Sequence, residues 1–191
     1  MKLQRQDFRF FDHLRVRWSE VDLQKIVFNA HYLMYFDTAI TGYWRALAMP
    51  YAESMATLGG DLFVRKAGIE FHASARWDDM LDIGMRCSRI GNSSITIAGA
   101  IFRGDQLLIT GELVYVFADP NTQTSRPVPD ALRQWLQAFE EGKSMLDVRT
   151  GDWATLGKFA SAVRTQVFVE EQGISQEDEW DAADATAIHT V

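Results

Sequence analysis

The sequence contains a single cysteine, Cys87, among its 191 residues. One thiol cannot form an internal disulfide, and Cys87 has no cysteine or histidine partner at the spacing of a metal site. We therefore interpret Cys87 as a small packing residue in a strand and expect no metal centre. A chain without disulfides also fits a reducing compartment, so the predicted location is the cytoplasm.

Long apolar segments are also missing. No stretch approaches the roughly 20 apolar residues that a membrane helix requires. Residues 1–11 mix charged and apolar residues and do not contain the apolar core of a signal peptide. The sequence therefore predicts a protein that has no membrane partner.

Excess positive charge is the third absence. The chain has 19 Lys and Arg against 26 Asp and Glu, a net charge of −7. Seven of the acids lie between Glu170 and Asp184, where there is no Lys or Arg, so 19 acids face 19 bases elsewhere. Because nucleic-acid affinity depends on clustered Lys and Arg, this neutral body argues against a nucleic-acid partner.

The spacing between apolar residues, in contrast, changes clearly along the chain. Residues 8–18 carry apolar side chains at spacings of two or four, which predicts a strand with one apolar face. From Ala30 to Leu47 the spacing becomes three or four, which predicts one long amphipathic helix that stops before Pro50. A helix of this kind needs a broad apolar surface to cover.

Such a surface is predicted by the next part of the chain. Four runs rich in β-forming residues follow, separated by turn signals. They are Leu62–Ala75, Met80–Ile90, Ser93–Phe102 and Leu107–Phe117. Pro129-Asp130 then opens a short helix. This order predicts an α+β fold in which an antiparallel sheet wraps around a long central helix.

The segment between the first strand and the long helix carries the candidate chemistry. Asp22 lies in this loop, and the loop ends at the N-terminus of the helix. Unpaired N–H groups at a helix N-terminus can stabilise the oxyanion that forms when a carbonyl group is attacked. Asp22 can attack as the nucleophile or activate water as a general base, and both roles remain open.

The sequence Glu20-Val21-Asp22, followed by Val27-Phe28-Asn29-Ala30-His31-Tyr32-Leu33, resembles the signature of the hydroxybenzoyl-CoA thioesterase branch of the hot-dog superfamily. The resemblance extends over residues 8–140. It implies a hot-dog fold and an enzyme that hydrolyses an acyl-CoA or acyl-carrier thioester to a free carboxylic acid and a thiol. It also implies a homodimer or homotetramer with acyl sites at the subunit boundary, and no cofactor other than CoA as part of the substrate.

Residue by residue, the resemblance assigns Asp22 as the catalytic carboxylate and the backbone N–H near Asn29 as the oxyanion donor. It extends the oxyanion and substrate-binding set to Asn29, Ala30, His31 and Tyr32. Two departures stand out: Lys25 occupies a position where many members have glycine, and Asn29 one where many have histidine. Because glycine favours positive φ, Lys25 leaves the path of the loop open.

Two other functions fit the same features. A hot-dog groove could hold an acyl chain without hydrolysing it, and the hydratase branch would act on an enoyl thioester without releasing thiol. The sequence has no recognisable hydratase Asp/His motif, which weighs against the second alternative.

The C-terminal segment has a separate character. Residues 164–174, 177–181 and 187–189 resemble the opening of a GNAT acetyltransferase, but the glycine-rich pyrophosphate loop of that family is absent. We interpret this segment as an incomplete GNAT-like module with α/β character, and a bifunctional thioesterase/N-acetyltransferase is the alternative. The expected organisation is therefore a hot-dog thioesterase domain at 1–141, a linker and first strand at 142–150, and the incomplete module at 151–191.

Overall fold

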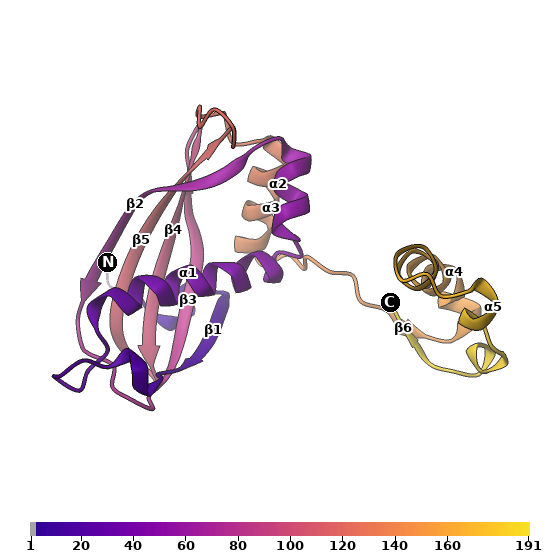
Figure 1. Cartoon of the computed structure of the whole chain (residues 1–191), viewed down its shortest axis with the longest axis horizontal. Helices are drawn as coiled ribbons and strands as arrows, with labels where there is room; N and C mark the ends of the chain where they lie inside the picture. The colour runs from indigo at the N-terminus through magenta and orange to yellow at the C-terminus, as the bar shows by residue number, and fades with distance from the viewer. Residues whose placement is uncertain (1–2) are drawn as a thin grey trace. The chain divides into compact units, whose positions relative to one another are not determined.

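A computed structural model describes residues 3–191. The chain divides into two compact units, with the division between Met145 and Leu146. The first unit contains a large sheet and three helices, and the second is small and mostly helical (Figure 1).

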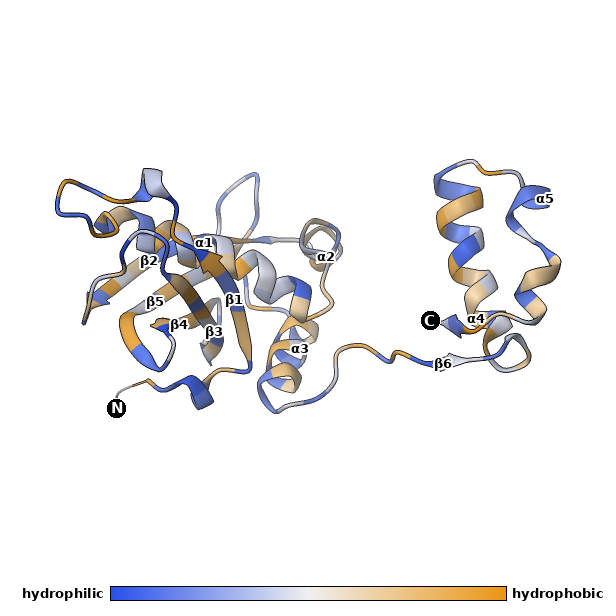
Figure 2. Ribbon diagram, turned by 90° about the horizontal axis from the view of Figure 1, so that it is seen from below, coloured by the Kyte–Doolittle hydropathy of each residue, from blue (hydrophilic) through white to orange (hydrophobic). Residues whose placement is uncertain are grey.

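The first unit is built on a five-stranded sheet in which every neighbouring pair is antiparallel. The strand order is β1-β3-β4-β5-β2, so β1 and β2 form the two edges. The strands are β1 (Phe10–Arg15), β2 (Asp61–Phe71), β3 (Met80–Ile90), β4 (Ser94–Arg103) and β5 (Gln106–Ala118). Short 3-10 turns at Arg5–Asp7 and Trp18–Glu20 flank β1. Apolar residues concentrate in the strands and in α1, and the connecting loops are mostly hydrophilic (Figure 2).

The long helix α1 (Asn29–Ala46) lies across this sheet and covers its apolar face (Figure 1). Phe36, at the middle of α1, is completely buried. Its ring rests on Gly99 and Gly111, which face each other across β4 and β5. A Cβ atom at these two glycines would come within 2.5 and 2.6 Å of the ring. The glycine pair therefore provides the space in the sheet that seats α1.

The structure confirms the predicted helix and strands with small shifts at their ends. The one larger difference is at β2, which ends at Phe71 and not at Ala75. The backbone of Ala75 makes other bonds: its N–H donates to the Tyr32 hydroxyl, and its carbonyl accepts from the Val27 N–H, both at 2.9 Å. Residues 72–79 are thus drawn away from the sheet towards the start of α1.

Two shorter helices complete the first unit. The sequence reasoning assigned no helix to residues 51–58, where the structure has α2 (Tyr51–Leu58), which ends at Gly59 with φ of +71°. The predicted helix after Pro129 is α3 (Asp130–Glu140). The two helices lie side by side and line an apolar cavity of about 420 Å³ (Figure 1).

The second unit, residues 146–191, has its own small core. Its main helix α4 (Trp153–Arg164) continues as a π-helix at Thr165–Glu171 and is followed by α5 (Gln176–Glu179) and a 3-10 turn at Ala182–Ala185. Two-residue strands β6 (Thr150–Gly151) and β7 (His189–Thr190) pair antiparallel. Arg164 bonds Asp184 at 2.6 Å and also pairs with Glu179, so two of the clustered acids are structural.

Over residues 3–191, none of the helices combines the length and the apolar character needed to cross a membrane.

Candidate active site

The loop between β1 and α1 forms a small hairpin over residues 20–28. The Phe28 N–H donates to the Glu20 carbonyl at 3.0 Å, and the Asp22 N–H donates to the Ile26 carbonyl at 2.9 Å. Between these bonds, Val21 and Val27 form an antiparallel bridge. The hairpin places Asp22 near its tip, and its second arm leads directly into α1. Asp22 and the start of α1 therefore lie at the same end of the unit.

The tip of this hairpin is a tight turn closed by Asp22. Its carbonyl accepts from the Lys25 N–H at 2.9 Å, and its Oδ1 accepts from the Gln24 N–H at 2.8 Å. Lys25 has φ of +62°, the left-handed conformation that favours glycine. A lysine can adopt it at a cost of about 1 kcal/mol, so the turn forms without the glycine. Asp22 is half-buried, and within residues 3–191 nothing donates to its Oδ2.

The N-terminus of α1 is open. Phe28 is the capping residue, and no side chain among the described residues caps this end of the helix. The first N–H groups of a helix have no partner inside it, and they carry the positive end of the helix dipole. Asn29 and Ala30 are both exposed at this end. Their backbone can therefore donate to an anionic group next to the Asp22 hairpin.

The other two predicted contact residues, His31 and Tyr32, are more buried than Asn29 and Ala30. His31 is half-buried, with its ring between those of Phe28 and Tyr35 at 6.1 and 6.4 Å. Tyr32 is 2% exposed, and its hydroxyl accepts the Ala75 N–H. Burial raises the pKa of Tyr32 above its usual value. This geometry favours a role for Tyr32 in anchoring α1 to residues 72–79, and not in direct contact with a substrate.

Glu20 also belongs to this site, although its role there could not be predicted from the sequence. Glu20 is 3% exposed, and it is the one buried charged residue among those described. Its carboxylate accepts from the Tyr35 hydroxyl at 2.8 Å and from the Arg17 N–H at 2.7 Å. Burial is the main reason why the pKa of Tyr35 is strongly raised, and the hydrogen bond to the Glu20 carboxylate adds to the effect. Glu20 thus joins the base of the hairpin to α1, and the spacing of an acid two residues before Asp22 was the only signal of it in the sequence.

We expect Glu20→Ala to lower the free energy of unfolding by about 2 kcal/mol, because the Tyr35 hydroxyl and the Arg17 N–H lose a charged acceptor. Both donors reach the same oxygen of Glu20, Oε2, so Glu20→Gln keeps a carbonyl oxygen that can accept both bonds and should lose less. Denaturant unfolding of both variants measures the effect. Glu141→Ala, which removes one exposed ion pair with Lys143, is the matched control. Equal stability of the Glu20→Ala and Glu141→Ala variants would contradict this role.

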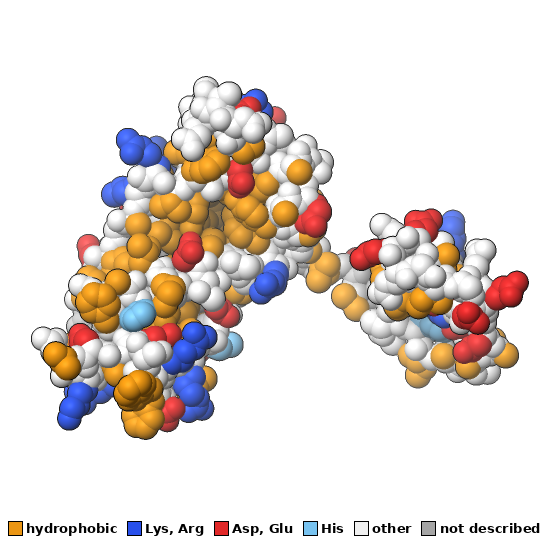
Figure 3. Space-filling view, in the orientation of Figure 1, with side chains coloured by type: hydrophobic (Ala, Val, Ile, Leu, Met, Phe, Trp, Pro, Cys, Tyr) orange, Lys and Arg blue, Asp and Glu red, His pale blue; other side chains and the backbone are white. Residues whose placement is uncertain are grey.

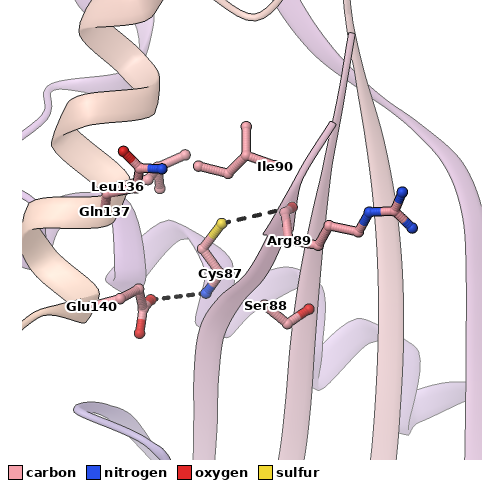
Figure 4. Close-up of a pocket in the computed structure, with 7 residues that line it drawn as sticks. All are labelled: Cys87, Ser88, Arg89, Ile90, Leu136, Gln137 and Glu140. Atoms are coloured by element: carbon pink, nitrogen blue, oxygen red, sulfur yellow. Dashed lines mark hydrogen bonds between the residues drawn. The ribbon is translucent and has the colours of Figure 1, made fainter. Parts of the chain in front are cut away.

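A second pocket lies between β3 and α3 and holds the single cysteine (Figure 4). It has a volume of about 180 Å³. Glu140 accepts from the Cys87 N–H at 2.8 Å and from the Tyr43 hydroxyl at 2.5 Å, so it connects α3 to β3 and α1. Burial, together with the charge of Glu140, raises the pKa of the Cys87 thiol to about 12. A thiol with this pKa is a poor nucleophile at neutral pH. We therefore interpret the pocket as part of the packing contact between α3 and β3.

The Asp22 hairpin, the open helix end and the sheet all lie within the segment that matches a family of known proteins. Residues 16–136, more than half of the chain, match the profile of the thioesterase-like superfamily. The chain belongs to this superfamily. The family match ends at residue 136, before the second unit begins, so nothing in it supports the predicted GNAT-like character of that unit.

Individual relatives agree with this assignment. The acyl-CoA thioester hydrolase YbgC of Escherichia coli is 27% identical over 120 residues, which cover 62% of this chain and 89% of that protein. Two solved structures share the fold. A thioesterase-superfamily protein from Jannaschia sp. CCS1 has a TM-score of 0.65 at 21% identity, covering 72% of this chain and 96% of that one. A 1,4-dihydroxy-2-naphthoyl-CoA thioesterase from Synechocystis has a TM-score of 0.61 at 16% identity, covering 67% of this chain and 95% of that one. The first unit therefore has the α+β hot-dog thioesterase fold.

Among residues 3–191, no three His, Cys, Asp or Glu side chains come together in a way that could hold a metal ion.

Proposed function

We propose that the first unit hydrolyses an acyl-CoA or a closely related thioester to a free carboxylic acid and a thiol. The chain is a thioester hydrolase by its family and its relatives. The proposal adds the groups that act: Asp22 as nucleophile or general base, and the N-terminus of α1 as the oxyanion site. The observation that carries it is a half-buried carboxylate in the hairpin that leads directly into an uncapped helix end.

The chemistry follows from these two groups. In one route the Asp22 carboxylate attacks the thioester carbon, the C–S bond breaks to release the thiolate, and water then hydrolyses the acyl anhydride. In the other route Asp22 takes a proton from water, which attacks the same carbon directly. Both routes place negative charge on the carbonyl oxygen. The N–H groups of Asn29 and Ala30 are the proposed donors to that oxygen.

Apolar surface next to the helix end offers a place for the acyl group. Leu33 and Met34, on the outer side of α1, are 40% and 46% exposed, and Phe71, at the end of β2, is 56% exposed. Phe71 packs against Tyr32 with ring centroids 5.8 Å apart, so it lies beside the first turn of α1. Hydrophobic side chains also gather in the hollow between α1 and the β2 side of the sheet (Figure 3). An acyl chain would exchange water for these side chains.

The test is release of free thiol from a panel of acyl-CoAs that differ in chain length and in aromatic character. Thiol release with formation of the carboxylic acid supports hydrolysis. Binding of acyl-CoA without thiol release would assign the unit as an acyl-binding module. Hydration of an enoyl-CoA without thiol release would assign it to the hydratase branch.

We expect the chain to form at least a dimer. β2 is an edge strand that carries exposed apolar side chains, including Val64, which is 54% exposed. An unpaired edge of this kind is a template for pairing with another copy. Light scattering at assay concentrations should give at least twice the chain mass of 21.7 kDa, and Val64→Asp should shift the protein towards monomer. A fully active monomer would contradict the expectation that acyl sites form at a subunit boundary.

A further inference from the structure

Two exposed tryptophans and three arginines form a surface that the proposed chemistry does not use. They come from two segments far apart in the sequence, residues 15–18 and 76–77. The segments meet because the Val16 N–H donates to the Asp79 carbonyl at 2.9 Å and the Asp78 N–H donates to the Val16 carbonyl at 3.1 Å. We call this surface the rim; its members are Arg15, Arg17, Trp18, Arg76 and Trp77.

The rim adjoins the candidate active site. Ala75, the residue before Arg76, is bonded both to Val27 in the second arm of the Asp22 hairpin and to Tyr32 in the first turn of α1. On the other side, Trp18 begins the 3-10 turn that enters the hairpin. Lys and Arg side chains surround hydrophobic ones at this end of the first unit (Figure 3). A substrate that places its thioester at Asp22 could therefore extend onto the rim.

Fold stability does not account for the two indole rings. Trp18 is 78% exposed and Trp77 is 61% exposed, so each leaves most of its apolar area in water. Single exposed apolar residues are ordinary, but two exposed tryptophans on segments that meet beside a site mark a binding surface. Flat aromatic rings stack on the faces of nucleobases whatever the base.

The charges of the rim fit an anion. Arg15 is neutralised by Asp78 at 2.8 Å. Arg17 is 73% exposed and lies 3.8 Å from Glu20, whose carboxylate is already bonded to Tyr35. Arg76 makes no ion pair among the described residues, and neither does Lys25 in the nearby hairpin. Three cations therefore remain for a ligand, and guanidinium groups bind phosphate with a matching geometry.

We propose that the rim, together with Lys25 of the adjacent hairpin, binds the adenine nucleotide of coenzyme A, with the indoles stacking on adenine and Arg17, Arg76 and Lys25 pairing with its phosphates. The proposal rests on the proposed thioester hydrolysis and names the thiol carrier as CoA. A small phosphorylated aromatic ligand fits a rim of this size better than an acidic carrier protein does. A stable protein partner would bury about 800 Å² on each side. Outside the rim the first unit carries 17 Asp and Glu against 13 Lys and Arg, so it offers an acidic protein no further positive surface.

The test compares two thioesters of the same acyl group, one of CoA and one of N-acetylcysteamine, which lacks the nucleotide. The variants are Trp77→Ala and the pair Arg17→Ala with Arg76→Ala. We expect each to raise KM for the CoA ester about tenfold, the scale of one lost base stack or phosphate contact, with kcat nearly unchanged. Rates with the N-acetylcysteamine ester should not change. Adenosine 3′,5′-bisphosphate should inhibit the wild-type protein competitively and the variants weakly.

Arg89→Ala is the matched control, because Arg89 is exposed on β3 and lies outside the rim. Equal KM values for the CoA ester in wild type and in both rim variants would overturn the proposal, even with hydrolysis intact. If the wild type prefers an acyl-carrier-protein thioester and the rim variants abolish that preference, the rim binds a protein donor and the proposal is overturned. Failure of the wild type to release thiol from either ester would instead count against the proposed function itself.

Discussion

Replacing Asp22 by Asn is expected to lower thioester hydrolysis at least about a hundredfold, the lower end of the contribution of a positioned acid–base group. Asn cannot accept a proton from water at neutral pH, and its amide is a poor nucleophile. The fold should persist, because Asn keeps a carbonyl oxygen that can accept the Gln24 N–H, as Asp22 does at 2.8 Å. Thiol release measures kcat, and thermal unfolding shows whether the variant is folded.

Asp105→Asn is the control for this experiment, since Asp105 is an exposed residue in the turn between β4 and β5. Turnover by Asp22→Asn comparable with that of the control would remove Asp22 from the mechanism. Mass spectrometry of the quenched wild-type reaction addresses the two routes. An acyl adduct on Asp22 would identify it as the nucleophile, and its absence at every time point in a single turnover would favour the general base.

Truncating Phe36 to Ala is expected to lower the free energy of unfolding by about 3–5 kcal/mol, the range for a large aromatic side chain removed from a core. Phe36 is completely buried, and its ring fills the space above Gly99 and Gly111. The variant leaves a cavity that the sheet cannot close, because neither glycine has a side chain to move into it. Denaturant unfolding measures the difference.

Thr41→Ala is the control, since Thr41 is exposed on α1 and should change stability little. If Phe36→Ala does not accumulate as folded protein, Phe36→Leu tests the same contact with a smaller loss. A stability loss from Phe36→Ala no larger than that from Thr41→Ala would show that the glycine pair does not seat the helix.

Much of the fold could be predicted because its elements are long and periodic. α1 and the four strands from β2 to β5 appeared within a few residues of their predicted ranges. α2 was not predicted, although Tyr51, Met55 and Leu58 have helical spacing. Its eight residues are too few for a periodic pattern to stand out. The end of β2 was placed four residues too late, because the bonds of Ala75 to Tyr32 and Val27 connect distant segments.

The sequence by itself determined the order of elements and the proximity of Asp22 to a helix N-terminus, because both depend on residues close together in the chain. It did not determine which side chains near Asp22 are buried. Glu20 and Tyr32 read as polar residues of a motif, and only packing against Tyr35 and Ala75 withdrew them from solvent. The rim likewise exists only after folding, since the pairing of β1 with β3 brings together the segments that carry Trp18 and Trp77. Burial and long-range pairing are properties of the assembled sheet and helix, and local sequence does not encode them.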